Sequence, residues 1–162
     1  MKKIFLASLL AVSISGSFAQ SNCVVKKAYA FYTVSIPGMP MKDEQGNTID
    51  PKEIVERFMY IEFKGTATPP LQNVMYNNIM FKTTLSRAGT TVSAGRYTTS
   101  NMDYRIYASK GNTLWKIELE PVDGKPEVKK DCKSIVIKTG AGSSICKYYV
   151  YKEMELASLP RY

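Results

Sequence analysis

Tyrosine and lysine are concentrated near the C-terminus of this chain. Lys147, Tyr148, Tyr149 and Tyr151 fall within residues 145–151, a segment whose composition predicts a strand. Successive strand residues point to opposite faces, so at least one face with tyrosine should meet solvent. Exposed tyrosine offers contact area to proteins and sugars. We therefore take these four residues as the candidate binding surface; the alternative is that tyrosine simply suits a half-buried strand.

Catalysis is restricted by the absence of histidine from the sequence. Ser-His-Asp and Cys-His nucleophile systems and His-ligated metal sites are excluded for this chain alone. Two acid pairs, Glu53 with Glu56 and Glu118 with Glu120, have the spacing to share a face, as glycosidase carboxylates and any exposed strand do. The acidic loop at 43–50 lacks the ligand order of an EF-hand. We expect no catalytic residue, no metal and no cofactor, with a histidine-free carboxylate hydrolase as the enzyme alternative.

The three cysteines allow one disulfide within the chain and leave one cysteine over. Cys132 and Cys146 flank the last predicted hairpin and would lie opposite each other if its turn centres near residues 139–140. This pairing is the preferred one. The alternatives join Cys23 to either of the other two cysteines and would fix the N-terminal segment to the sheet.

Short strand-like segments separated by turn residues dominate the chain after residue 20. The segment at 113–120 alternates most clearly, with Trp115, Ile117 and Leu119 on one face. One short helix is predicted over residues 50–57, where Asp50 is a helix-capping residue and Pro51 suits the first turn. The fold class is mainly β, an antiparallel sandwich or small barrel of about seven or eight strands with at most one short helix. The other predicted strands cover residues 28–36, 58–64, 74–76, 79–85, 104–108, 134–138 and 145–151, and residues 37–50 form a loop.

The first 19 residues have the pattern of a secretory signal peptide. Lys2 and Lys3 precede an apolar run at residues 4–14, and Ser17 and Ala19 place small side chains before a cleavage site. The run is shorter than the roughly 20 residues of a membrane span. We expect a single β-rich domain at 20–162, periplasmic or extracellular. Lipid anchoring through Cys23 is the alternative, although the residues before it depart from the lipoprotein pattern.

The excess of basic over acidic residues indicates which kinds of partner the protein could bind. The formal net charge is +8, and without Lys2 and Lys3 the basic residues exceed the acidic ones by six. In an exported protein this excess favours an anionic envelope surface or an acidic glycan over nucleic acid as partner; the alternative is that the charge serves solubility alone. The expected function is a non-catalytic binding or structural module of the bacterial envelope that acts through the Tyr/Lys surface on an envelope protein. The alternative is a glycan-binding module. The sequence identifies neither the partner nor the oligomeric state.

Overall fold

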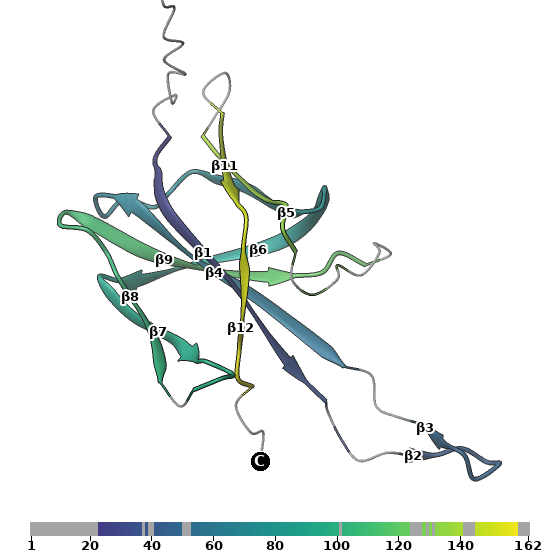
Figure 1. Ribbon diagram of the computed structural model, residues 1–162. Coiled ribbons are helices and arrows are strands. Elements are labelled where there is room, and N and C mark those ends of the chain that lie inside the picture. The colour runs from purple at the N-terminus through teal and green to yellow at the C-terminus, as the bar shows by residue number, and fades with distance from the viewer. Residues whose placement is uncertain are drawn as a thin grey trace, which may run out of the picture.

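The computed structural model describes residues 23–36, 38, 41–49, 53–100, 102–123, 128, 130, 132–140 and 145–158 (Figure 1). The signal-peptide prediction for residues 1–19 therefore lies outside the described residues. Every regular element within them is a strand, and none of them forms a helix long and apolar enough to cross a membrane. The strands are β1 (Val25–Ser35), β2 (Met41–Lys42), β3 (Thr48–Ile49), β4 (Ile54–Lys64), β5 (Leu71–Tyr76), β6 (Ile79–Gly89), β7 (Thr91–Arg96), β8 (Asp103–Tyr107), β9 (Asn112–Glu120), β10 (Ile135–Thr139), β11 (Cys146–Val150) and β12 (Glu153–Leu156).

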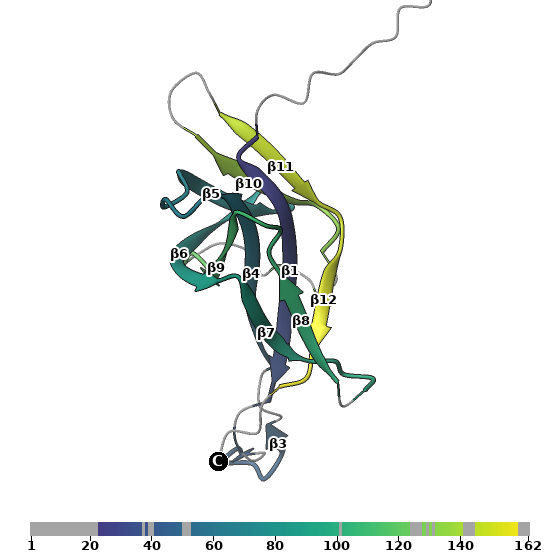
Figure 2. The same cartoon turned by 90° about the vertical axis from the view of Figure 1, so that its left-hand side faces the viewer.

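Eight strands form one nearly closed sheet in the order β11-β10-β5-β6-β9-β4-β1-β12. All neighbours are antiparallel except β1 and β12, which are parallel. β11 and β12 are separated only by Tyr151 and Lys152, so one C-terminal segment supplies both edges of the sheet (Figure 2). The expected mainly β fold, a sandwich or small barrel, is thus confirmed, with one parallel pair in a sheet that was expected to be antiparallel.

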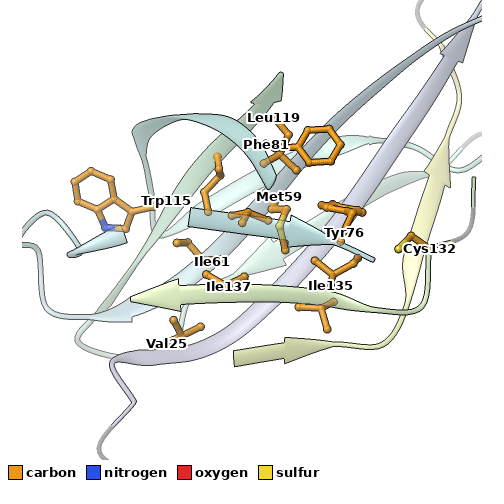
Figure 3. Packing of buried hydrophobic residues seen from close by; sticks show 14 of the residues in the cluster. Val25, Met59, Ile61, Tyr76, Phe81, Trp115, Leu119, Cys132, Ile135 and Ile137 are labelled. Carbon is orange, nitrogen blue, oxygen red and sulfur yellow. The ribbon is translucent and has the colours of Figure 1, made fainter. Parts of the chain in front are cut away.

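The inner face of the barrel holds the main hydrophobic core. Trp115, Ile117 and Leu119 of β9 point inward as the alternation predicts, and Ile117 lies directly across from Met59 of β4. Figure 3 shows Met59 of β4 among Tyr76 of β5 and Ile135 and Ile137 of β10, which belong to the same cluster. The alternation of side chains along a strand thus determines which of them are buried in the core.

A second core lies on the outside of the sheet. The β7–β8 hairpin crosses the outer face of β1, β4 and β9 (Figure 2) and buries Phe31, Tyr60 and Leu114 beneath Ile106. The Phe31 ring stacks on Phe58, with centroids 5.5 Å apart, and meets Tyr104 edge-on at 5.1 Å. β1 and β4 are consequently buried on both faces, which explains their long aromatic and aliphatic runs.

The predicted helix at residues 50–57 is wrong where the structure describes it. Ile54 begins β4, and residues 54–57 form the far end of its ladder with β1, where Ile54 pairs with Ser35 and Arg57 with Tyr32. The capping residues Asp50 and Pro51 lie outside the described residues. A helix cap stabilises a segment less than hydrogen bonding to a partner strand along its whole length. The β-branched residues Ile54 and Val55 also favour the strand conformation.

Turn chemistry was predicted more reliably. Asn77 and Asn78 join β5 to β6 with φ angles of 47° and 66°, the left-handed conformation that a two-residue hairpin turn needs. In contrast, β7 was not predicted, and the expected loop at 37–50 contains the β2–β3 ladder. β7 carries Ser, Ala and Gly rather than an apolar alternation, so its sequence gave no strand signal.

The preferred disulfide is also corrected. Cys146 is bonded to Cys23, with Cα atoms 5.4 Å apart, and Cys132 is a buried thiol. The register of the β10–β11 hairpin pairs Thr139 with Cys146 and Ile135 with Val150. The turn therefore lies further along the chain than residues 139–140, and Cys132 falls at the opposite end of the hairpin from Cys146. The observed disulfide fastens the start of β1 to the start of β11.

Candidate functional site

The predicted Tyr/Lys surface divides between the two faces of β11. Tyr148 points inward and is half-buried against the main core, whereas Lys147 and Tyr149 are exposed on the outer face. Tyr149 and Tyr151 are 51% and 76% exposed, and their nearly parallel rings have centroids 6.4 Å apart. Burial raises the pKa of the Tyr148 hydroxyl, and the nearby Tyr29 and Glu62 add to the shift. Tyr148 therefore belongs to the core, and the outward site consists of the other three residues.

An apolar row extends this site across the sheet. The ladder places Tyr149 beside Val136 of β10, Val136 beside Met75 of β5, and Met75 beside Met80 of β6. Tyr149 and Met80 at the two ends are about half exposed, and Val136 between its neighbours is 9% exposed. We call Tyr149, Val136, Met75 and Met80, together with Tyr151, the Tyr/Met strip. Four of its members come from four different strands and Tyr151 follows β11, so no single segment of sequence could have revealed it.

Lysines border the Tyr/Met strip along β10 and β11. Lys138 and Lys147 occupy directly opposite positions in the ladder, and Lys152 follows Tyr151. None of these three lysines forms an ion pair within the described part of the chain. Two like charges facing each other across a ladder repel, so this border favours an anionic contact.

A charged cluster is buried at one end of the barrel interior. The Arg57 Nε donates a hydrogen bond to Glu153 Oε1 at 3.0 Å, and the side chains are 4% and 0% exposed. The same guanidinium donates to the carbonyl of Val128 at 3.1 Å and lies 5.6 Å from the centre of the Tyr76 ring. Burial raises the pKa of Tyr76, and the Glu153 carboxylate raises it further. The cluster ties β12 to β4, because separating the pair would leave a buried charge without its counterion.

Glu62 is the second buried carboxylate, and it anchors the turn between β8 and β9. Its Oε1 accepts hydrogen bonds from the Ser109 N–H at 3.0 Å and from Asn112 Nδ2, while Oε2 lies 3.7 Å from Lys27 Nζ. Burial by itself raises the pKa of this carboxyl, but the two donors and Lys27 outweigh it and leave the pKa below its usual 4.5. Glu62 thus holds in place the chain that leads from the β7–β8 hairpin back to the sheet.

Of the acid pairs considered from the sequence, Glu53 and Glu118 form ordinary surface ion pairs. Glu118 and Glu120 both point outward from β9, and Lys116 Nζ donates to Glu118 Oε1 at 2.8 Å. Glu53 is ion-paired with Lys130 at the surface. Within the described ranges, no group of three or more Cys, Asp or Glu side chains is placed to hold a metal ion.

A groove of about 570 Å³ lies between the β7–β8 hairpin and the sheet. Its lining comes from β1, β4 and β9 of the sheet, from β7 and β8 of the hairpin, and from the end of β12 with the residues after it. Gly95 allows β7 to lie close to the end of β12, because a Cβ at this position would lie 3.2 Å from Cδ1 of Leu156. Its lining residues are Thr33, Ser35, Glu56, Phe58, Ser93, Ala94, Gly95, Arg96, Asp103, Lys116, Leu156, Ala157 and Ser158. No pattern in the sequence indicated this groove, because its residues come from distant segments.

Compared with known protein families, curated proteins and solved structures, the chain matches none of them.

Proposed function

We propose that this protein is a non-catalytic binding module of the bacterial cell envelope and that the Tyr/Met strip is its contact surface. The observation that carries the proposal is the pair of stacked, exposed rings of Tyr149, on the outer face of β11, and Tyr151, just after β11. Tyrosine in this setting presents a large apolar area with a hydrogen-bonding hydroxyl and few rotatable bonds.

The partner is a protein with an acidic surface. Methionine and tyrosine are enriched at protein–protein contacts, and the flexible methionine side chains of Met75 and Met80 adapt to a partner's side chains. Lys138, Lys147 and Lys152 supply positive charge beside the apolar row. Such a border favours acidic partners and accelerates their association.

Location in the periplasm or outside the cell is part of the proposal. The N-terminal pattern of residues 1–19 supports export. The Cys23–Cys146 disulfide is compatible with an oxidising compartment, and it occupies the sulfur that a lipid anchor on Cys23 would need.

The experiment is an affinity purification from the native envelope under non-reducing conditions, followed by titration of the recovered partner against the purified protein. We expect the Tyr149→Ser/Tyr151→Ser double variant to bind at least about tenfold more weakly, with weaker binding of the wild type at higher salt. The matched control is Tyr107→Ser, because Tyr107 is 60% exposed but belongs to β8. Thermal unfolding of all variants checks that they remain folded.

Equal binding by the double variant and the control would contradict the proposed surface. A partner that binds with no dependence on salt would contradict the acidic character. Retention of an acidic polysaccharide in place of a protein would replace the protein partner with the glycan-binding alternative.

A further inference from the structure

The native disulfide joins the two cysteines that lie farthest apart in the sequence. Cys23 and Cys146 have a sequence separation of 123, whereas Cys132 lies only 14 residues before Cys146. In an unfolded chain, the probability that two residues meet falls with about the 3/2 power of their separation, so Cys132 should meet Cys146 about 25-fold more often than Cys23 does. Chain statistics therefore favour a disulfide that the folded protein does not contain.

The register of the sheet excludes this short-range disulfide. In the β10–β11 ladder Thr139 lies opposite Cys146, and Ile135 lies opposite Val150. A Cys132–Cys146 disulfide would need Cys132 in the place of Thr139, which is a shift of seven positions. Because seven is odd, the shift would also turn the inward side chains of one strand toward solvent. A chain with this disulfide must therefore break it before the native hairpin forms.

The place of Cys132 in the folded protein prevents this disulfide from forming again. Its side chain is 4% exposed, and its sulfhydryl donates a hydrogen bond to the Ser134 carbonyl over 3.6 Å. Burial disfavours the thiolate, which is the reactive form in disulfide exchange. Cys132 also lies at the opposite end of the hairpin from Cys146. Folding thus isolates the third thiol.

We propose that the native disulfide forms by thiol–disulfide exchange from a transient Cys132–Cys146 disulfide, with Cys132 as the leaving thiol. In the first step, the Cys132 and Cys146 thiols give two electrons and two protons to a disulfide oxidant, which becomes two thiols. In the second step, the Cys23 thiolate attacks Sγ of Cys146. The Cys132–Cys146 bond breaks as the Cys23–Cys146 bond forms, and Cys132 leaves as a thiolate that takes up a proton. The exchange needs no further oxidant.

The assembly of the barrel favours the product of this attack. Cys23 lies two residues before β1, and Cys146 is the first residue of β11. Their Cα atoms are 5.4 Å apart in the folded protein, a separation that suits a disulfide. Attack on Cys132 instead would give a Cys23–Cys132 disulfide, which the hairpin does not accommodate because Cys132 lies at its other end. The exchange therefore proceeds to the native pairing as β1 and β11 come together.

The test follows the oxidation of the reduced, urea-unfolded protein after dilution into buffer with oxidised glutathione at about pH 8, near the pKa of a free thiol. Samples are quenched at intervals with N-ethylmaleimide and digested with trypsin without reduction. Trypsin cleaves after Lys26, Lys133 and Lys138, so the three cysteines fall in different peptides. Mass spectrometry then identifies and quantifies each disulfide.

Two matched variants each leave a single possible disulfide. Cys132→Ser can form only the native one, and Cys23→Ser only the short-range one. In the wild type we expect the Cys132–Cys146 disulfide to exceed the native one at least about tenfold at early times and to decay as the native one appears. Cys132→Ser should lack this early disulfide, and Cys23→Ser should retain it throughout.

Three outcomes would overturn the proposal. The first is that Cys23–Cys146 is the earliest disulfide in the wild type. The second is that Cys23–Cys132 is the main early species. The third is that Cys132–Cys146 decays more slowly than the native disulfide appears, because the native disulfide then has another source.

Discussion

The two halves of the main sheet have equivalent inner faces and different outer faces. Over β1, β4 and β9, the β7–β8 hairpin buries a second core around Phe31, which is 0% exposed. Over β11, β10, β5 and β6, the corresponding outer positions hold the Tyr/Met strip, with Tyr149 at 51% exposure. An aromatic residue on an outer sheet face therefore has no fixed role. Its role depends on whether another element covers that face.

The largest effect should come from the disulfide that joins the two halves. Cys23 and Cys146 enclose a loop with a sequence separation of 123, for which the chain-entropy model gives about 4 to 5 kcal/mol. We expect the Cys23→Ser/Cys146→Ser variant to lose an amount of this order in free energy of unfolding, measured by urea denaturation. Cys132→Ser is the control, with a loss of about 1 kcal/mol. Equal losses in the two variants would show that the disulfide does not fasten the halves.

The next largest effect compares the loss of stability when an aromatic side chain is truncated on the covered and on the uncovered outer face. Phe31→Ala should lower the free energy of unfolding by about 3 to 5 kcal/mol, because it leaves a cavity between the hairpin and the sheet. Tyr149→Ala should change it by no more than about 0.5 kcal/mol. Denaturant titration of both variants gives the comparison. A loss of stability for Tyr149→Ala similar to that for Phe31→Ala would place Tyr149 in a core and end its role as a contact residue.

The smallest effect is the pH dependence of stability that arises from Glu62, the buried carboxylate that holds the turn between β8 and β9. The folded pKa of Glu62 lies below its usual 4.5, so its ionised form stabilises the fold. This contribution is fully present above about pH 4.5 and is lost as the pH falls through the folded pKa. Unfolding measured between pH 7 and pH 3 should therefore show a steeper loss of stability for the wild type than for Glu62→Gln. Parallel curves for the two proteins would contradict the anchoring role.

Much of the fold was predictable because it depends on local pattern. Trp115, Ile117 and Leu119 alternate with polar residues, and that alternation selects the buried face wherever the strand lies. Asn77 and Asn78 tolerate the left-handed conformation that their turn needs, which made the β5–β6 hairpin visible from its sequence.

The errors arose where the outcome depended on partners distant in sequence. Residues typical of a helix start precede residues 54–57, yet these residues form a strand that pairs with β1. Cys132 lies nearer to Cys146 in sequence than Cys23 does, but the hairpin register carries Cys132 to the other end. Of the candidate site, Lys147, Tyr149 and Tyr151 were identified as a group, whereas Val136, Met75 and Met80 were not.

The sequence by itself determined that the described chain is mainly built of strands, which side chains of β9 turn inward, and which histidine-dependent chemistries this chain lacks. These properties follow from residue type and from the two-residue period of a strand. Only the tertiary structure decided the strand order, the cysteine pairing, the covering of one outer face and the joining of four strands into a strip. Each of these depends on register between distant segments, and a shift of one residue would move every side chain of a strand to the opposite face.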